Sequence, residues 1–547
     1  MRYEINYETK DDKKVAKSSD DALDVLVSTE GVINKVTIKA KEDLTLVALK
    51  LELDYEFKKD DALFCNGYQS CTDTKEFGID EKLNNLKQIP GFGVKMFSFK
   101  SYGDIAFYEY QKNVLHGWDV CYIRGEKNLF IGNNNYEWAG MIIEFHIEEN
   151  KIVLVNDINR PTLAKGDELT IFDFNLEEFS DLDHLEYFNK FKPRTTKKLL
   201  GYSSWYNHFD KINQDIVLEN LKSVDKNHYD LFVIDDGYES AVGDWRICNK
   251  QKFPNGLGAV VERIHSKEVM AGIWLAPFVG AEDSRLFKTR PDWFKKDNEG
   301  KYIKCGSNWG GFYALDFYNP SVQKYIKDCL LYFKGLGFDY FKLDFLYAVS
   351  LPEYHGKNRS QVACDAYRFL REVLGDSLIL GNSCIMAPAF GVFDFVRVGP
   401  SVTTEWDDSW LMRKMHRERN STKHTILNTI SRSIFNGKVF LNDPDVFLLR
   451  KDIALTDDQK KSLAIINAIF GSALTTSDDI STYDRLYPNY DKKAAAILEQ
   501  IVSIFKNATN PSFKKVGKLI AISYELNGVT QKLSYDPEDG ILREVYR

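Results

Sequence analysis

The chain has 547 residues, of which 44% are hydrophobic and 28% charged, so it is long enough for several domains and too apolar to be disordered. Its 72 basic and 80 acidic residues give a net charge of −8, which argues against nucleic-acid binding through phosphate contacts. The N-terminus lacks the apolar core of a signal peptide, no long apolar run could span a membrane, and the eight cysteines form no CxxC pair. We therefore expect a cytoplasmic protein with reduced thiols that binds neither membranes nor nucleic acid.

Residues 1–185 contain short apolar runs interrupted by Asn, Gly and Asp, for example at 45–54, 139–148 and 151–157. No long amphipathic helix is evident in this region. The pattern predicts an N-terminal β-sandwich domain. The acidic stretch 175–188 at its end is expected to form a connecting helix or linker.

Residues 186–480 alternate between strand-like and helical segments. Helical patterns such as 212–224 and 457–471 separate eight strand-like runs. Eight strands alternating with helices predict a central (β/α)8 TIM barrel. The eight predicted strands are 199–206, 230–238, 269–278, 339–348, 377–383, 393–400, 437–444 and 472–478.

Residues 481–547 show a third sequence pattern. A helical pattern at 492–507 is followed by strand-like segments with turn residues between them. We predict a final helix and a small C-terminal antiparallel β-domain.

Polar and aromatic residues occur at almost every predicted strand end, where a (β/α)8 barrel carries its chemistry. Taken singly they are ordinary, because an Asp at a strand end is most often a helix cap or turn former and a Trp is usually core. Their coincidence predicts one polar cleft rimmed by aromatic rings. The residues are Trp205, Asp235, Asp236, Asp244, Trp274, Lys342, Asp344, Asn382 and Arg397.

Such a cleft suits glycoside hydrolysis, which in retaining enzymes uses a carboxylate nucleophile and a carboxylic acid about 5–5.5 Å apart. Lys342 and Asp344 lie two residues apart on one strand, so their side chains share a face. A lysine beside a carboxylate favours its ionised, nucleophilic form. The spacing therefore favours an ionised Asp344, the state that a nucleophile requires.

Several motifs occur in an order and spacing that resemble glycoside hydrolase family 36, the melibiase-type α-galactosidases. They are NGYQS (66–70), SWY (204–206), IDDGY (234–238), GIWLAPF (272–278), YFKLDF (340–345), FDFVRVGP (393–400) and FLNDPD (440–445). The resemblance implies an N-terminal β-supersandwich, a central barrel and a C-terminal β-domain. It also implies retaining hydrolysis of terminal α-galactosides in melibiose- or raffinose-type oligosaccharides, without metal or organic cofactor, and is compatible with a homo-oligomer.

The resemblance also implies roles for individual residues. Asp344 would be the nucleophile, Trp274 would pack against the sugar, and Tyr68 would close the cleft from the N-terminal domain. The galactose hydroxyls would be held by Asp235, Asp236, Lys342 and Arg397, with Trp205, Asp244 and Asn382 as further substrate-binding candidates.

Two positions depart from the family pattern. Ser401 stands where the family has its acid/base aspartate, and a serine hydroxyl cannot supply the about 10²–10⁴-fold of general acid–base catalysis near neutral pH. Asn382 stands where the family usually has a cysteine, which bears on the group accepted at the sugar 2-position.

Three explanations for Ser401 are open. The acid/base role has moved to a nearby carboxylate, with Glu405, Asp407 and Asp408 as candidates and Glu405 first among them; or the chain binds galactosides but has lost most turnover; or the alignment of this segment is offset. A transgalactosylase or an α-N-acetylgalactosaminidase of the same family is the further alternative.

Overall fold

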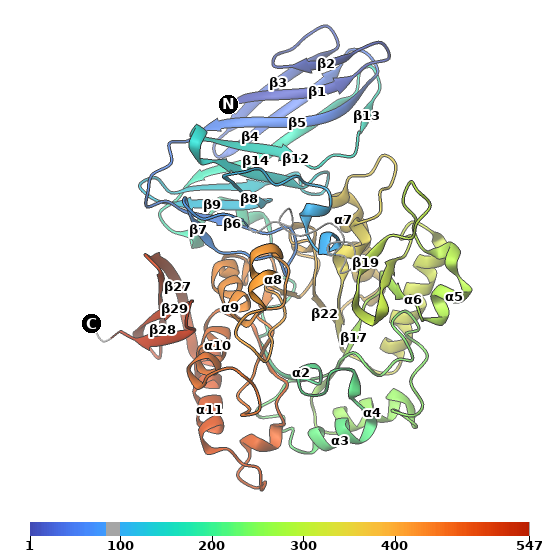
Figure 1. Ribbon diagram of the computed structural model, residues 1–547, viewed down its shortest axis with the longest axis vertical. Coiled ribbons are helices and arrows are strands. Elements are labelled where there is room, and N and C mark those ends of the chain that lie inside the picture. Colours follow the sequence, from blue (N-terminus) through green and yellow to red (C-terminus); the bar gives the residue numbers. More distant parts are fainter. Residues whose placement is uncertain (84–98, 546–547) are drawn as a thin grey trace.

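The computed structural model describes residues 1–83 and 99–545. A β-rich unit lies at the top of Figure 1, a barrel lies beneath it, and a small C-terminal sheet stands beside the barrel helices. The chain runs through these three parts in that order.

The N-terminal part consists of two seven-stranded antiparallel sheets. Apolar residues alternate with polar ones along the strands, as in Ile33–Ala40, where Val36 and Ile38 are buried. The buried faces share one hydrophobic core, which makes this part a β-sandwich. The first sheet has the order β2 (Lys13–Ala16), β1 (Arg2–Glu8), β5 (Leu44–Asp54), β12 (Lys151–Asn156), β11 (Met141–His146) and β8 (Val114–Trp118), with β13 (Thr162–Leu163) also beside β5; the second has β3 (Leu23–Glu30), β4 (Ile33–Ala40), β14 (Glu168–Glu178), β10 (Leu129–Asn133), β9 (Val120–Arg124), β6 (Ala62–Cys65) and β7 (Glu76–Gly78).

The expectation for the acidic stretch 175–188 is wrong at its start. Strand β14 continues to Glu178, paired with β10 throughout 174–178, because alternate apolar residues such as Leu176 pack against the sandwich core. Two short 3-10 helices, Leu182–His184 and Glu186–Lys190, then connect to the barrel.

The central part is built on one parallel sheet that closes on itself. Its strand order begins with β24 and ends with β25, yet only Pro444 and Asp445 separate these two strands in sequence. They are therefore two halves of one interrupted stave, and the proline lies at the interruption because it cannot donate a ladder hydrogen bond. Each of the eight predicted strand segments contains a strand of this barrel. The strands are β15 (Leu199–Ser203), β16 (Leu231–Ile234), β17 (Met270–Leu275), β21 (Tyr340–Leu343), β22 (Leu378–Gly381), β23 (Phe395–Arg397), β24 (Leu441–Asp443), β25 (Val446–Phe447) and β26 (Ala473–Thr476).

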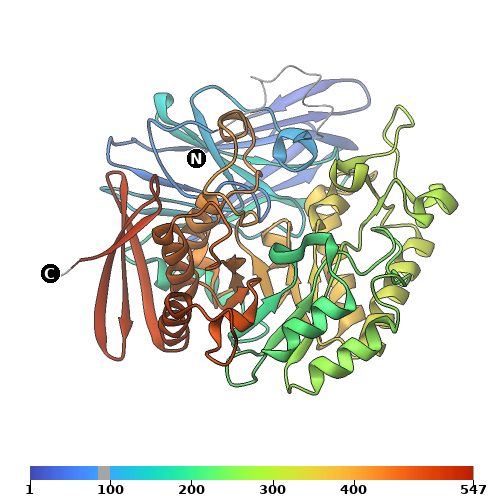
Figure 2. The same ribbon diagram turned by 60° about the horizontal axis from the view of Figure 1, so that its bottom comes forward.

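Helices surround the barrel strands, as the second view shows (Figure 2). In the helix Pro320–Gly335 the buried residues Val322, Ile326, Leu330 and Phe333 recur every three or four positions and form one face against the sheet. The long helices are α3 (Gln214–Lys222), α4 (Gly256–His265), α6 (Pro320–Gly335), α7 (Arg359–Leu374), α9 (Thr422–Ser431) and α10 (Asp457–Phe470); α2 (Trp205–His208), α5 (Arg285–Thr289) and α8 (Trp410–Met415) are short, and β18 (Val279–Ala281), β19 (Lys304–Gly306) and β20 (Phe312–Ala314) form a small sheet after β17.

The C-terminal part has one helix, α11 (Lys492–Asn507), and one four-stranded antiparallel sheet. The sheet contains β27 (Ala508–Val516), β28 (Leu519–Leu526), β29 (Val529–Asp536) and β30 (Ile541–Glu544). Phe513 and Ile522 of this sheet share a core with Ile466 of α10, so the sheet is packed on the barrel helices. Arg124 of the sandwich donates a 2.7 Å hydrogen bond to the Phe513 carbonyl and joins the sheet to the sandwich.

All eight cysteines are free. Within residues 1–83 and 99–545, the helices are too short or too polar to cross a membrane.

Candidate active site

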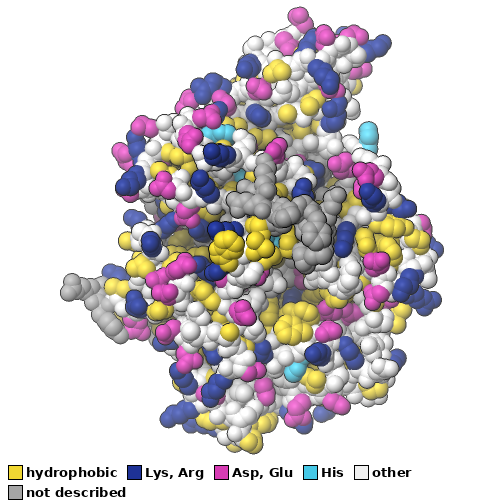
Figure 3. All heavy atoms as spheres, in the orientation of Figure 1, with side chains coloured by type: hydrophobic (Ala, Val, Ile, Leu, Met, Phe, Trp, Pro, Cys, Tyr) yellow, Lys and Arg dark blue, Asp and Glu magenta, His cyan; other side chains and the backbone are white. Residues whose placement is uncertain are grey.

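A cleft with a volume of about 490 Å³ opens at the carboxyl ends of the barrel strands, where the sandwich meets the barrel. Figure 3 views this face, on which apolar side chains gather between the sandwich and the barrel helices. Carboxylates and a lysine at the strand ends form the polar part of the cleft, and aromatic rings form much of its wall. The predicted site residues that line it are Trp205, Asp235, Asp236, Trp274, Lys342, Asp344, Asn382 and Ser401.

Asp344 directly follows strand β21 and receives four hydrogen bonds. The Trp274 indole N–H and the Asn382 amide donate to Oδ2 at 3.1 and 2.9 Å. The Ser383 hydroxyl and the Phe345 backbone N–H donate to Oδ1 at 2.9 and 2.6 Å. Phe345 has a left-handed backbone with φ 50°, an uncommon conformation for a bulky residue that turns the chain immediately after the carboxylate. Both oxygens of Asp344 are thereby fixed in orientation.

Lys342 pairs with Asp235 in the barrel floor. Its Nζ lies 2.7 Å from Asp235 Oδ2, and its side chain is 8% exposed. The Ser203 hydroxyl also donates to Asp235 Oδ2 at 3.0 Å, and the Asp236 backbone N–H donates to Oδ1 at 3.0 Å. Lys342 was expected beside Asp344, but Asp344 already lies beyond the end of the strand. The side chains that donate to it come from β17 and from the end of β22.

Asp236 is buried and interacts with Glu239, a second buried carboxyl that was not predicted from the sequence. The Trp309 indole N–H donates to Asp236 Oδ2 at 3.1 Å. Burial, together with the charge of Asp235, raises the pKa of Asp236. Burial and a hydrogen bond with Asp236 raise the pKa of Glu239 well above its ordinary value. Burial and the neighbouring Asp236 carboxyl therefore favour the protonated form of Glu239.

Aromatic side chains make the wall of the cleft. The Trp274 and Trp309 rings lie with centroids 6.0 Å apart, and the Trp205 ring contacts Phe209 edge-on at 5.3 Å. All four line the cleft. Indole rings of this kind offer apolar faces to the C–H groups of a sugar ring while their N–H groups hold the carboxylates.

Arg397 lies beneath the cleft and is not among the residues that line it. Its guanidinium forms ion pairs with Asp443 at 2.9 Å and with Asp445 at 3.0 Å, and all three side chains are buried. The Tyr206 hydroxyl donates to Asp445 and links this ion cluster to the cleft wall. The predicted contact of Arg397 with a sugar hydroxyl stays a prediction.

Tyr68 and Asp244 also lie outside the lining of the cleft. Tyr68 is 4% exposed and packs against Trp118, with ring centroids 4.9 Å apart, in the hydrophobic cluster that also contains the barrel core. Asp244 accepts hydrogen bonds from the backbone N–H groups of Arg285 and Leu286 at 2.7 and 2.9 Å, so it stabilises the start of α5. The NGYQS loop does reach the cleft, through its own Gln69 and the adjacent Cys71.

Ser401 lines the cleft, whereas the three nearby carboxylates differ in position. Glu405 is exposed and lies outside the lining residues. Asp407 forms an ion pair with Arg419 at 3.2 Å. Asp408 lines the cleft. The proposed role of Glu405 stays a prediction.

Part of the lining is not predictable from the sequence because these residues belong to loops whose position depends on tertiary contacts. Two features of the sequence could have pointed to them. Ser383 directly follows the predicted Asn382, and Trp309 stands beside two glycines. The missed residues are Gln69, Cys71, Trp309, Ser383, His416 and Glu418. No group of three or more His, Cys, Asp and Glu side chains suited to a metal ion is found within 1–83 and 99–545.

A protein-family model described as Melibiase matches residues 186–375, which carry β15 to α7 and most of the cleft carboxylates. This part of the chain is similar to the melibiase family. This match and the relatives below confirm the predicted resemblance to the melibiase-type α-galactosidases of glycoside hydrolase family 36.

Two sequence relatives show how much of the chain aligns with other proteins. The bifunctional alpha-galactosidase/sucrose kinase AgaSK of Mediterraneibacter gnavus is 23% identical over 44% of this chain and 29% of that protein. Alpha-galactosidase 1 of Pediococcus pentosaceus is 32% identical over 22% of this chain and 18% of that protein. The chain spans less than a third of the length of these relatives.

Structural similarity covers more of the chain. TtGalA, an alpha-galactosidase from Thermus thermophilus solved with p-nitrophenyl alpha-D-galactopyranoside, has a TM-score of 0.70 at 22% identity, over 92% of this chain and 98% of that one. At this identity the likeness shows a shared fold.

Proposed function

We propose that the chain is a retaining α-galactosidase that acts on terminal α-galactosyl residues of oligosaccharides, with Asp344 as nucleophile. The observation that carries the proposal is the Asp344 carboxylate, held by four hydrogen bonds at the end of β21 in a cleft of sugar size. A nucleophile needs such fixed orientation to reach the anomeric carbon from one side. The match to the melibiase family and the named activities of the relatives support this reaction class.

The polar floor suits one sugar ring. Asp235, Asp236 and Lys342 present carboxylate and ammonium groups that bind vicinal hydroxyls, and Trp274 offers an apolar face. Asn382, which donates to Asp344, takes the place where the family usually has cysteine. In the proposed reaction the Asp344 carboxylate forms a covalent glycosyl-enzyme with loss of the aglycone, and water then releases galactose with the original anomeric configuration.

The test is the anomer of the first product. Wild-type protein with p-nitrophenyl α-galactoside, followed by proton NMR, is expected to release α-galactose before mutarotation, and Asp344→Asn is expected to release none. First release of β-galactose would contradict a retaining mechanism, and unchanged turnover by Asp344→Asn would contradict the assigned nucleophile.

Ser401 favours a second candidate, a galactoside-binding protein with little turnover. Without a carboxylic acid at this position, leaving groups that need protonation depart slowly. This candidate predicts measurable binding of galactose by calorimetry and no detectable hydrolysis of melibiose. Hydrolysis of melibiose at an ordinary enzymatic rate would exclude it.

A further inference from the structure

The loop that carries Ser401 returns to it about twenty residues later. The Ser421 backbone N–H donates a 3.1 Å hydrogen bond to the Ser401 carbonyl oxygen. Residues just before Ser421 are therefore brought beside the position that lacks its carboxylate. Among them, Glu418 lines the cleft together with Asp344 and Ser401.

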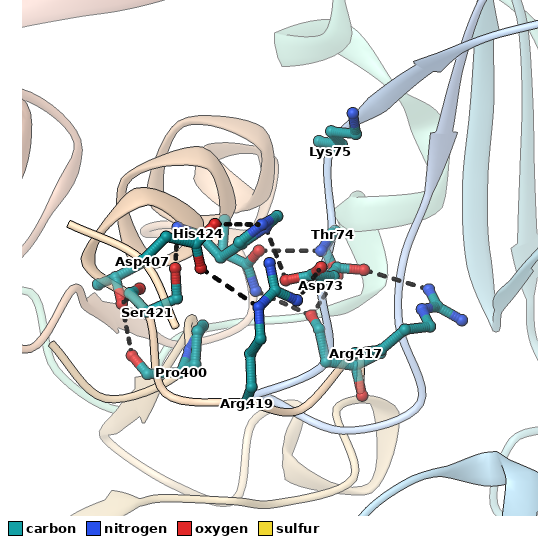
Figure 4. A network of polar contacts seen from close by, with 12 residues as sticks. Asp73, Thr74, Lys75, Pro400, Asp407, Arg417, Arg419, Ser421 and His424 are labelled. Atoms are coloured by element: carbon teal, nitrogen blue, oxygen red, sulfur yellow. Dashed lines mark hydrogen bonds and ion pairs between the residues drawn. The ribbon is translucent and has the colours of Figure 1, made fainter. Parts of the chain in front are cut away.

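Buried ion pairs with the sandwich hold this returning segment, as Figure 4 shows. Arg419 pairs with Asp73 Oδ2 at 3.1 Å, and Arg417 donates to the Asp73 carbonyl oxygen at 3.1 Å. His424 Nδ1 lies 2.7 Å from Asp73 Oδ1. Both arginines are 3% exposed. Because its two neighbours are fixed to the same residue, Glu418 has little freedom to leave the cleft.

Neighbouring residues contact the Glu418 carboxyl group and leave space for it. The Thr72 hydroxyl donates to Oε1 at 2.9 Å, and His416 Nδ1 lies 3.4 Å from Oε2. A side chain at Gly103 would bring a Cβ to 2.4 Å from Oε1, so the glycine there leaves the room that the carboxyl fills. The side chain is 5% exposed. Glu418 is thus a mostly buried carboxyl with one edge on the cleft.

We propose that Glu418 is the acid/base residue that replaces the missing aspartate at 401, a proposal that rests on the proposed glycosidase function. As the Asp344 carboxylate forms its bond to the anomeric carbon, the bond to the leaving oxygen breaks and that oxygen takes the Glu418 proton. In the second half, the Glu418 carboxylate takes a proton from the attacking water, whose oxygen bonds to the anomeric carbon as the bond to Asp344 breaks. Glu418 ends protonated and Asp344 ends ionised, as they began.

The other carboxylates of the loop are less suited to the acid/base role. Glu405 lies outside the cleft, and Asp407 is committed to its ion pair with Arg419. Asp408 lines the cleft, but its Oδ1 accepts a 2.6 Å hydrogen bond from the Ser409 backbone N–H at the start of α8. Asp408 therefore already has the role of a turn former beside a helix start.

The experiment compares leaving groups in Glu418→Gln, which keeps the shape of the side chain and its ability to accept from Thr72. Melibiose needs protonation of its leaving oxygen, and 2,4-dinitrophenyl α-galactoside does not. We expect kcat/KM of Glu418→Gln to fall about 10²–10⁴-fold for melibiose and only a few-fold for the dinitrophenyl substrate. Added azide is expected to yield α-galactosyl azide with this variant and not with wild type. Glu299→Gln, on an exposed turn, is the matched control with unchanged activity.

The outcomes separate this proposal from the function on which it rests. Labelling of Asp344 by a 2-fluoro-galactosyl fluoride in Glu418→Gln shows that the variant is folded and that the nucleophile is competent. Given that label, equal losses for both substrates, no loss, or an azide product from wild type would overturn the role of Glu418. The leaving-group pattern in Glu405→Gln or Asp408→Asn, instead of Glu418→Gln, would also overturn it. Absence of label in wild type would overturn the proposed function itself.

Thr72→Val provides a second variant if Glu418→Gln does not fold. It keeps the carboxyl group and removes one hydrogen bond to it. We expect a loss of about 10-fold in kcat/KM for melibiose with little change for the dinitrophenyl substrate. An unchanged melibiose rate in this variant would count against Glu418.

Discussion

Lys342 Nζ and Asp235 Oδ2 lie 2.7 Å apart, so the barrel lysine pairs with the aspartate of the neighbouring motif and not with Asp344, two residues further along the chain. The Asp344 carboxylate receives its hydrogen bonds from uncharged donors. The two halves of the site therefore have different chemistry. A charged pair forms the floor for sugar hydroxyls, and a neutral hydrogen-bonding shell orients the carboxylate proposed to react.

Lys342→Met is expected to lower the free energy of unfolding by about 3–5 kcal/mol, because it leaves the Asp235 charge buried without its partner. Urea unfolding followed by circular dichroism measures the loss. The double variant Lys342→Met/Asp235→Asn removes both charges and is expected to recover part of that stability. If the single and double variants lose the same free energy, the pair has no coupling and the assignment is wrong.

Ser383→Ala is expected to lower kcat/KM for p-nitrophenyl α-galactoside by about 10- to 100-fold, since it removes one hydrogen bond to a charged group. The free energy of unfolding should change much less. Steady-state kinetics measures the effect. An unchanged kcat/KM would mean that Trp274, Asn382 and the Phe345 backbone hold the carboxylate without the serine.

Glu239→Gln and Glu239→Leu should behave differently if Glu239 donates a proton to Asp236. The amide of Gln supplies the same donor, so we expect the KM for the galactoside to stay near its wild-type value. Leu removes the donor, and we expect KM to rise about 10-fold because Asp236 loses its orientation. A KM for Glu239→Gln as high as that for Glu239→Leu would contradict the shared proton.

The buried Asp119 of the sandwich predicts a pH dependence of stability. Burial raises the pKa of Asp119 to about 6, while the unfolded chain has an ordinary Asp pKa near 3.8. The folded state therefore holds the proton to higher pH, so the stability present below pH 4 is lost as pH rises toward 6 and beyond. Two pKa units amount to about 2–3 kcal/mol.

Asp119→Asn removes this titration. Its free energy of unfolding, measured in urea at pH 4 and pH 7, is expected to fall about 2 kcal/mol less over that interval than that of wild type. Asn can still accept the hydrogen bonds from Asn133 and the Met141 backbone N–H. Parallel losses in the two proteins would show that Asp119 is ionised in the folded state throughout.

The barrel was predictable from sequence because strands and helices alternate with different hydrophobic periods. Each predicted strand segment contains a stave, although strand boundaries shifted by a few residues. The interruption at Pro444 was not predicted as a break. It follows from closure of the sheet, where β24 pairs with β23 and β25 pairs with β26.

The site was predictable where residues belong to strand ends and not where loops fold back. Asp235, Trp274 and Asp344 are placed by the barrel itself, so their motifs put them in the cleft. Arg397 occupies a strand end as well, but Asp443 and Asp445 hold it below the cleft. Glu418 is positioned by its neighbour Arg419, which forms an ion pair with Asp73, more than 300 residues away in sequence. No local sequence pattern reveals this contact.

The most direct test of the account is to trap the glycosyl-enzyme. Wild-type protein is incubated with a 2-fluoro-galactosyl fluoride, digested and analysed by mass spectrometry. We predict one added 2-fluorogalactosyl group, on the peptide that contains Asp344, and none in Asp344→Asn. Label on a different carboxylate, or label that persists in Asp344→Asn, would contradict the assignment of the nucleophile.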